Sequence, residues 1–347
     1  MNLRLYLKEF ERKFDMEKAV CNHGFFMMAP NVWDPKSKSL TRPLTLSNSS
    51  SVSVTISHPR TLSFLVIQVH GINNVSRVDE ELILQQVGRM LRISAEDDRD
   101  VTEFQQLHED AKKYGFGRIF RSPFLFEDMV KSILLSNMTW ERTLGMASSL
   151  CLLQSKLADG TVSSQTNKKR KRVVKARKET SGNFPSAKEI ASLDKDLINE
   201  HCKLGYRAKW IVKLAKMVES GKLNLEEMER RDMKAEEVSE KLNKLKGFGP
   251  FSTATVLMCI GYYHLVPSDT ETLRLFREVH VNVECSKETL ETAAQSFYDR
   301  FSPFQSLAYW FDLIQNYETK LGKLSELSQL DYKSVSGCSH MKQLKAD

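Results

Sequence analysis

The most restrictive feature of the sequence is a short glycine turn between two apolar helical patterns. Residues 238–245 carry apolar side chains at the spacing of one helix face, and Gly247-Phe248-Gly249-Pro250 follows directly. Pro250 suits the first position of a second helix, because a missing N–H costs nothing there. The apolar run that begins at Phe251 predicts that helix. We therefore expect a helical hairpin over about residues 238–263.

The predicted turn has the features of an anion site. Two glycines let the backbone approach a ligand closely, and the first N–H groups of the following helix are free. Such a positive helix end suits a phosphate. Asp269 follows twenty residues after Gly249, at the predicted start of another helix. A phosphate anchor with a carboxylate at a set distance is the arrangement expected of an enzyme that acts on a DNA sugar.

Each of these features also has a purely structural interpretation. A tight turn between packed helices needs glycine without any ligand, and an aspartate after Pro267-Ser268 is an ordinary N-cap. The combination, at this separation and within a helical region, favours the functional interpretation.

Hydrophobic periodicity divides the chain into a strand-containing part and a helical part. Residues 1–112 are predicted to form an α+β domain with antiparallel strands, and residues 113–328 a helical core. Residues 157–181 break the helical pattern and are expected to form an exposed, disordered insertion. Residues 329–347 are expected to be a polar, frayed tail. The two predicted strands have alternating apolar residues: Val52, Val54 and Ile56 in one, and Leu62, Phe64 and Val66 in the other.

The positive charge of the chain is concentrated in one segment. The 347 residues carry a formal net charge of +7, but residues 168–178 alone contribute eight lysines and arginines without an acid. The rest of the chain is near neutral, so its charge alone does not establish a nucleic-acid partner. The Lys-Lys-Arg-Lys-Arg run at 168–172 is compatible with a nuclear localisation signal, a DNA tether or a solvated loop.

Several function classes are not expected from the sequence. No apolar run approaches the ~20 residues that cross a bilayer, and the N-terminus mixes acids with bases, unlike a targeting peptide. The six cysteines show no CxxC spacing, which favours a reducing compartment and argues against zinc, a disulfide framework or an iron–sulfur cluster. Cys21 and His23 form an isolated pair, so no metal site is expected.

Four segments together resemble one enzyme family. Besides the hairpin with its aspartate, they are Ser122-Pro123-Phe124-Leu125-Phe126-Glu127, Gly205-Tyr206-Arg207-Ala208-Lys209-Trp210 and Phe304-Gln305-Ser306-Leu307-Ala308-Tyr309-Trp310. The sequence resembles the helix-hairpin-helix Gly/Pro–Asp (HhH-GPD) superfamily of DNA glycosylases, between its 8-oxoguanine and 3-methyladenine II branches. The resemblance covers about residues 15–320. It implies an α+β fold with a mostly helical glycosylase core after an N-terminal antiparallel sheet.

The resemblance also implies roles for individual residues. Gly247, Gly249 and the N–H of Phe251 would grip a DNA phosphate, and hairpin carbonyls could hold a monovalent cation. Asp269 would be the catalytic carboxylate. A helix N-terminus would keep it ionised at neutral pH. The expected DNA contacts around the vacated base stack are Asn137, Arg142, Tyr206 and Arg207.

Two departures from the family pattern bear on the reaction. Members with lyase activity carry a lysine two residues after the second glycine, where this chain has Phe251, which cannot form a Schiff base. Lys244 and Lys246 precede the turn. The base-pocket glutamine and phenylalanine of the 8-oxoguanine branch correspond to Asp312 and Asn316, which do not fit recognition of that lesion.

The sequence therefore predicts a nuclear, monomeric and monofunctional DNA N-glycosylase of base excision repair. Its partner would be double-stranded DNA with a damaged base, and an alkylated purine is slightly preferred as that base. The enzyme would need no cofactor. Three alternatives stay open at this stage. They are a bifunctional glycosylase/lyase acting on oxidised purines, a noncatalytic helix-hairpin-helix DNA-binding protein, and a scaffold for repair partners that uses the basic segment.

Overall fold

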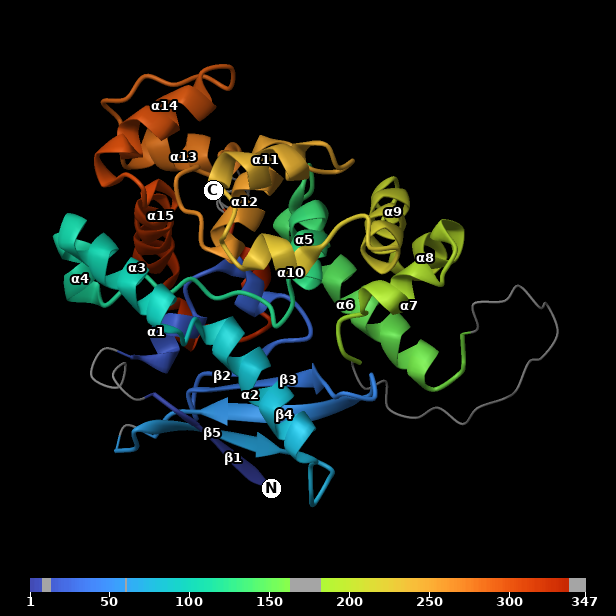
Figure 1. Ribbon diagram of the computed structural model, residues 1–347. Helices are drawn as coiled ribbons and strands as arrows, with labels where there is room; N and C mark the ends of the chain where they lie inside the picture. Colours follow the sequence, from blue (N-terminus) through green and yellow to red (C-terminus); the bar gives the residue numbers. More distant parts are fainter. Residues whose placement is uncertain (8–13, 60, 163–181, 337–347) are drawn as a thin grey trace.

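A five-stranded antiparallel sheet lies at one end of the molecule, and helices form the rest (Figure 1). The computed structural model describes residues 1–7, 14–59, 61–162 and 182–336. The order of the strands in the sheet is β1-β5-β4-β3-β2, with every neighbouring pair antiparallel. The strands are β1 (Asn2–Tyr6), β2 (Val32–Asp34), β3 (Ser39–Thr45), β4 (Ser51–Ser57) and β5 (Phe64–Val69). The predicted α+β fold with an N-terminal antiparallel sheet is confirmed.

The two predicted strands exist, but one of them buries the opposite face from the one expected. In β4, Val52, Val54 and Ile56 point into the core as predicted. In β5 the buried residues are Leu65, Ile67 and Val69, not the predicted set of Leu62, Phe64 and Val66. The run is apolar at nearly every position, so its period does not reveal which face is inside. Pairing with β4 decides it, because Ile56 lies opposite Ile67 and Val54 opposite Val69.

The rest of the described chain is built from helices (Figure 1). The helices are α1 (Met16–Val20), α2 (Arg77–Leu91), α3 (Ala95–Leu107), α4 (Glu109–Tyr114), α5 (Leu125–Leu135), α6 (Trp140–Ala158), α7 (Ala187–Ala191), α8 (Lys195–Cys202), α9 (Arg207–Glu219), α10 (Leu225–Glu229), α11 (Ala235–Asn243), α12 (Pro250–Ile260), α13 (Thr270–Glu278), α14 (Leu290–Tyr298) and α15 (Gln305–Leu321). The predicted domain boundary at residue 112 falls inside α4. Helix α6 continues through the first two residues of the predicted insertion, and the basic residues 168–178 lie outside the described residues.

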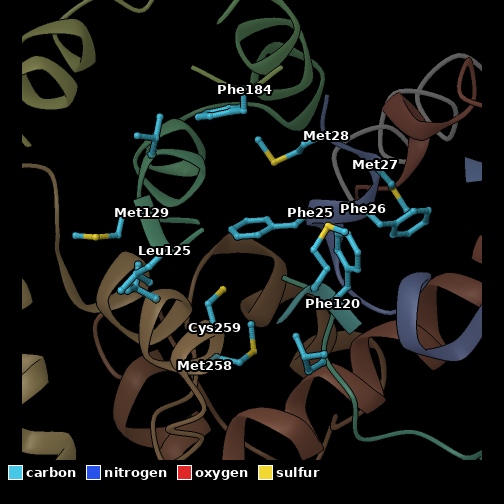
Figure 2. Close-up of a cluster of buried hydrophobic side chains, with 14 of the residues drawn as sticks. Phe25, Phe26, Met27, Met28, Phe120, Leu125, Met129, Phe184, Met258 and Cys259 are labelled. Atoms are coloured by element: carbon cyan, nitrogen blue, oxygen red, sulfur yellow. The ribbon is translucent and has the colours of Figure 1, made fainter. Parts of the chain in front are cut away.

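The sheet end and the helices share one hydrophobic core (Figure 2). A 3₁₀ turn, Gly24–Met27, carries Phe25 and Phe26 from the sheet side into contact with the helical side. Figure 2 shows Phe25 and Phe26 in one cluster with Leu125 of α5 and Met258 of α12. The four side chains are buried. Because this core is continuous, the N-terminal residues help to position the hairpin helix α12.

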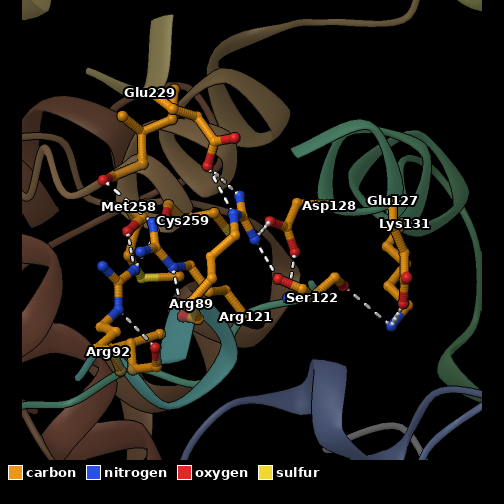
Figure 3. Close-up of polar contacts among 12 residues, drawn as sticks. Arg89, Arg92, Arg121, Ser122, Glu127, Asp128, Lys131, Glu229, Met258 and Cys259 are labelled. Carbon is orange, nitrogen blue, oxygen red and sulfur yellow. Dashed lines mark hydrogen bonds and ion pairs between the residues drawn. The ribbon is translucent and has the colours of Figure 1, made fainter. Parts of the chain in front are cut away.

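Two arginines, Arg92 buried and Arg121 partly buried, hold the far end of α12 (Figure 3). Arg92 donates from Nη2 to the carbonyl oxygens of Met258 (2.6 Å) and Cys259 (3.0 Å), and Arg121 donates to Cys259 at 2.8 Å. Arg92 also pairs with Asp97 at 3.1 Å. The last carbonyls of a helix lack intrahelical partners and carry partial negative charge, so cations suit them. The C-terminal end of α12 is therefore anchored, and the glycine turn at its other end is held in place.

Residues 329–336 are more ordered than their composition indicates. Residues 329–347 were expected to form a polar, frayed tail; residues 337–347 lie outside the described residues, but Tyr332 and Val335 are buried. The indole Nε1 of Trp140 donates to the carbonyl oxygen of Tyr332 at 2.7 Å. Two buried side chains and one indole hydrogen bond are enough to attach this segment to the helical body, which local polarity does not reveal. Within the described residues, no helix combines the length and apolar character needed to cross a membrane.

Candidate active site

The glycine turn joins α11 to α12 with a geometry that only glycine suits at its first position. Gly247 has φ +101°, in the left-handed region that favours glycine. A Cβ at Gly247 would lie 2.9 Å from Cε3 of the Trp210 ring, closer than real contacts allow. Both the backbone and the neighbouring helix α9 therefore require glycine here.

Gly249 differs, because folding does not require a glycine at this position. Its backbone is extended, with φ −117° and ψ −174°, and a Cβ built there meets no atom within 4 Å. Its N–H donates to the hydroxyl of Ser252 at 3.2 Å. Within the described chain, the N–H groups of Gly247 and Phe251 donate no hydrogen bond. The turn thus offers two amides without a partner in the described chain, and the space beside the α-carbon of Gly249 is open.

Asp269 is the N-cap of α13, and the cap uses one of its two carboxylate oxygens. Oδ1 accepts from the N–H of Glu271 at 2.9 Å and of Thr272 at 3.2 Å. The hydroxyl of Thr272 in turn lies 2.9 Å from that of Tyr309 on α15. In the described structure, Oδ2 of Asp269 accepts no hydrogen bond. One oxygen is fixed to the helix, and the other makes no hydrogen bond within the described residues.

The pKa of Asp269 is higher than its place at a helix start indicates. The expectation was that the helix dipole would hold this carboxyl well ionised. Burial raises its pKa to about 6, and the carboxylate of Glu271 adds to the rise, against the lowering effect of the cap hydrogen bonds. Asp269 is still mostly ionised at pH 7, but it titrates close to neutrality, as catalytic carboxyls often do.

A cavity of about 420 Å³ contains both Asp269 and Phe251 in its wall. Much of the wall is aromatic, and it is built from segments that are far apart in sequence. The wall includes His23, Phe25, Trp140, Arg142, Phe251, Asp269, Tyr309, Trp310, Leu313, Tyr317 and Lys333. The position where lyases carry a lysine therefore holds a phenyl ring in the same cavity as the carboxylate. The sequence indicated Phe251, Asp269 and Arg142 but not the other walls of this cavity.

The two base-pocket positions transferred from the 8-oxoguanine branch do not line this cavity. Asp312 accepts from the hydroxyl of Tyr298 at 2.9 Å and pairs with His280 at 3.0 Å. Asn316 accepts from Arg274 at 2.8 Å. Helix α15 instead presents Leu313 and Tyr317 to the cavity. Spacing from one tryptophan therefore gives the sequence counterparts of the base-pocket residues but not the face of α15 that lines the cavity, because packing sets the rotation of a helix.

Three of the four expected base-stack contacts lie at the surface. Asn137, Arg142 and Tyr206 are exposed, and half of the Tyr206 surface (50%) is accessible. Asn137 lies in the loop between α5 and α6 and has a positive φ of +51°. Arg207 differs, because it is 2% exposed and donates to the backbone oxygens of Ile133, Ser136 and Asn137. The resemblance implied a DNA contact for Arg207. The guanidinium instead fixes the loop that presents Asn137.

The cavity wall also contains polar atoms that lack partners. Nδ1 of His23 and Nε1 of Trp310 have no hydrogen-bond partner among the described residues, and the two rings meet edge to face at 4.5 Å. Burial lowers the pKa of His23 to about 3, so the ring is neutral at any physiological pH. Buried unpaired polar atoms cost about 1–3 kcal/mol each, and such groups often belong to functional sites.

A metal site is not formed by the described residues, because nowhere in them do three His, Cys, Asp or Glu side chains cluster as metal ligands would. Cys21 is buried, and burial raises the pKa of its thiol. Three carboxyl side chains line the cavity, those of Glu141, Asp269 and Glu271, and burial raises the pKa of Asp269 to about 6.

Comparison with known proteins gives matches only at the level of structure. No protein-family model and no curated protein sequence matches the chain. The 3-methyladenine DNA glycosylase from Archaeoglobus fulgidus superposes with a TM-score of 0.57 at 18% identity, over 91% of this chain and 99% of that one. MBOgg1 in complex with a low-affinity DNA ligand has a TM-score of 0.58 at 18% identity, over 86% and 91%.

A third structure belongs to the same group. The 8-oxoguanine glycosylase/lyase from Clostridium acetobutylicum in its apo form has a TM-score of 0.52 at 17% identity, over 78% of this chain and 87% of that one. Identities this low establish the fold and leave the reaction open. The likeness runs over most of each chain, and it includes both the sheet end and the helical body. This protein therefore has the fold of the HhH-GPD DNA glycosylases.

Proposed function

We propose that the protein is a DNA N-glycosylase that hydrolyses the N-glycosidic bond of a damaged base turned out of the duplex. The observation that carries this proposal is the state of Asp269. Its Oδ1 is held by two backbone amides, its Oδ2 accepts no hydrogen bond within the described chain, and it lines a base-sized cavity. A protein that only binds DNA gains nothing from an anion of this kind beside phosphates.

Binding would begin at the hairpin and the loop before α6. The free amides of Gly247 and Phe251 would receive a phosphate at the N-terminal end of α12. Tyr206 and Asn137 are exposed and would occupy the stack that the damaged nucleotide leaves. Extrusion costs roughly a few kcal/mol, and it costs least for a weakly paired base. Arg207 acts as a positioning residue, since it holds the backbone of Asn137.

Asp269 would then stabilise the charge that develops on the sugar. As the base departs with the electrons of the glycosidic bond, positive charge builds up at C1′ of the deoxyribose. The ionised carboxylate faces that charge and orients the water that attacks C1′, taking up its proton. Tyr309 holds Thr272 and therefore supports the cap that fixes Oδ1.

The cavity favours a flat and electron-poor base. Trp140, Tyr309 and Trp310 contribute aromatic rings to the wall, and such rings attract cations. Alkylated purines carry positive charge and are good leaving groups. We therefore propose them as the preferred substrates, with the Phe251 ring in place of a nucleophilic lysine. The protein would act as a monomer, and nuclear localisation would follow from the basic run at 168–172.

The experiment that tests this function measures base excision on a set of labelled duplexes, each with one lesion, with and without alkaline cleavage. Strand breaks that appear only after alkali mean base release without lyase action, and the cleaved duplex names the substrate. Breaks without alkali contradict the monofunctional reaction. DNA binding without release from any duplex would point to a noncatalytic protein.

One observation favours a second candidate, a glycosylase with lyase activity. Lys333 of the C-terminal segment lines the same cavity as Asp269, so an amine is present although Phe251 supplies none. In this reaction the amine attacks C1′, the base leaves with the glycosidic electron pair, and the opened sugar forms an imine. Borohydride reduces that imine to a stable enzyme–DNA adduct. Trapping in the wild type that disappears in Lys333→Ala but persists in Lys323→Ala would favour the lyase.

A further inference from the structure

A second concave surface lies between α9 and the start of α8. This groove has a volume of about 510 Å³ and shares no lining residue with the cavity of Asp269. Val212 and Met217 contribute its apolar lining. Its cationic lining consists of Lys195, Lys209, Lys213, Lys216 and Lys222, all exposed. We call this surface the α9 lysine groove.

Most of these charges are not neutralised by the protein. Lys195 pairs with Asp196 at 3.2 Å. Within the described chain, Lys209, Lys213, Lys216 and Lys222 form no salt bridge, and Asp194 is the acid among the residues that line the groove. Like charges this close repel one another, so their grouping favours an anionic partner over an empty surface.

The α9 lysine groove begins beside the proposed DNA-binding residues. Trp210 packs against Gly247 of the hairpin turn, and its ring lies 4.6 Å from that of Tyr206, just before α9 begins. Lys209 comes directly before Trp210 in the sequence. Lys213 and Lys216 follow Lys209 at helical spacing, so the three lysines form one stripe along α9, next to the face that carries Trp210. Lys209 and Lys216 are separated by about 10 Å along the helix, which corresponds to roughly three base pairs of duplex.

We propose that the α9 lysine groove binds the phosphate backbone of the duplex next to the extruded nucleotide. The proposal rests on the proposed function for the placement of the damaged base, but its contacts are distinct from that site. Lysine acts on phosphate as a flexible point charge, so the groove adds affinity without reading sequence. An acidic protein segment would satisfy the charge as well. The continuity of the lysine stripe with Tyr206 and the hairpin favours DNA.

The test measures binding to an undamaged duplex, so that its outcome does not depend on which lesion is excised. The full chain, the variant K209Q/K213Q/K216Q and the control K36Q/K112Q/K113Q are titrated with a duplex of about 25 base pairs at several salt concentrations. Both variants lose three positive charges at exposed positions. Each lost phosphate contact lowers the slope of log affinity against log salt by about 0.9.

Opposite outcomes are expected for the two variants. For the groove variant, the slope of log affinity against log salt should be smaller in magnitude by about 2–3, and the affinity near 0.1 M salt should be roughly 10- to 100-fold lower. The control should stay close to the wild type in both quantities. Equal affinities and slopes for the groove variant and the wild type would overturn the groove proposal and leave the excision chemistry intact. A wild type that binds no duplex at all would overturn both the groove and the proposed function.

Discussion

The α-carbon of Gly247 lies against the ring of Trp210, so closely that a Cβ would come within 2.9 Å of the indole, whereas a Cβ at Gly249 would meet nothing within 4 Å. The two glycines of the turn thus serve different purposes. Gly247 is required by packing and by its positive φ of +101°. Gly249 is required by neither, which fits the proposal that a ligand approaches the amides of the turn at this position.

This difference predicts opposite results for two alanine substitutions. Gly247→Ala should destabilise the fold by about 1–3 kcal/mol, because the methyl group meets Trp210 in a strained backbone conformation. Gly249→Ala should leave the melting temperature within a few degrees of the wild type but weaken DNA binding. Thermal unfolding and DNA titration of both variants check this. Equal losses of stability would show that Gly249 is structural after all.

Replacing the carboxylate separates capping from chemistry. Asp269→Asn keeps an oxygen that accepts from the amides of Glu271 and Thr272, so α13 should still be capped. The negative charge is lost, and single-turnover excision should fall by about 10³-fold or more. DNA affinity should be retained, which fluorescence anisotropy with an uncleaved duplex measures. Wild-type excision by this variant would remove the carboxylate from the mechanism.

The pH dependence of excision follows from the pKa of Asp269, which burial raises to about 6. The ionised form is the active one, so the logarithm of the single-turnover rate should rise with a slope of 1 up to about pH 6 and level off above it. The stability of the fold changes with pH in the opposite direction to the excision rate. Because the folded-state pKa lies above the unfolded value, the stabilising contribution of the protonated form is lost as pH rises through 6. A rate that is independent of pH between 5 and 7 would contradict this assignment.

A buried ion cluster predicts acid sensitivity elsewhere in the fold. Glu127 of α5 pairs with Arg42 of β3 at 2.9 Å and with Lys131 at 2.8 Å, all three buried. The two cations lower the pKa of Glu127 to about 2. Its contribution to stability is therefore complete above about pH 4.5 and is lost as pH falls toward 2.

Removing the anion should leave two buried cations unpaired. Glu127→Ala is expected to cost about 3–5 kcal/mol in urea unfolding at neutral pH. Glu81→Ala breaks an exposed pair with Arg77 and should cost less than about 0.5 kcal/mol. Similar small losses for both variants would show that the cluster does not stabilise the fold.

Features that depend on neighbouring residues could be predicted from the sequence alone. The hairpin needs a glycine turn and a proline at the helix start, and the cap at Asp269 needs only the residues that follow it. Strand β4 shows the alternation of a half-buried strand. Turn chemistry, capping and periodicity act over a few residues, so the printed sequence contains them.

The tertiary structure decided what depends on contacts between distant segments. Pairing with β4 determined which face of β5 is buried. The loop that contains Asn137 determined that Arg207 is buried, because the guanidinium donates to the backbone of that loop. The cavity wall combines His23, Trp140 and Lys333, whose separation along the chain hides their proximity. The pKa of Asp269 rises for the same reason, because desolvation is the sum of all packed neighbours. The sequence by itself thus determined where the glycine turn and the capping carboxylate lie, and only packing decided what surrounds them.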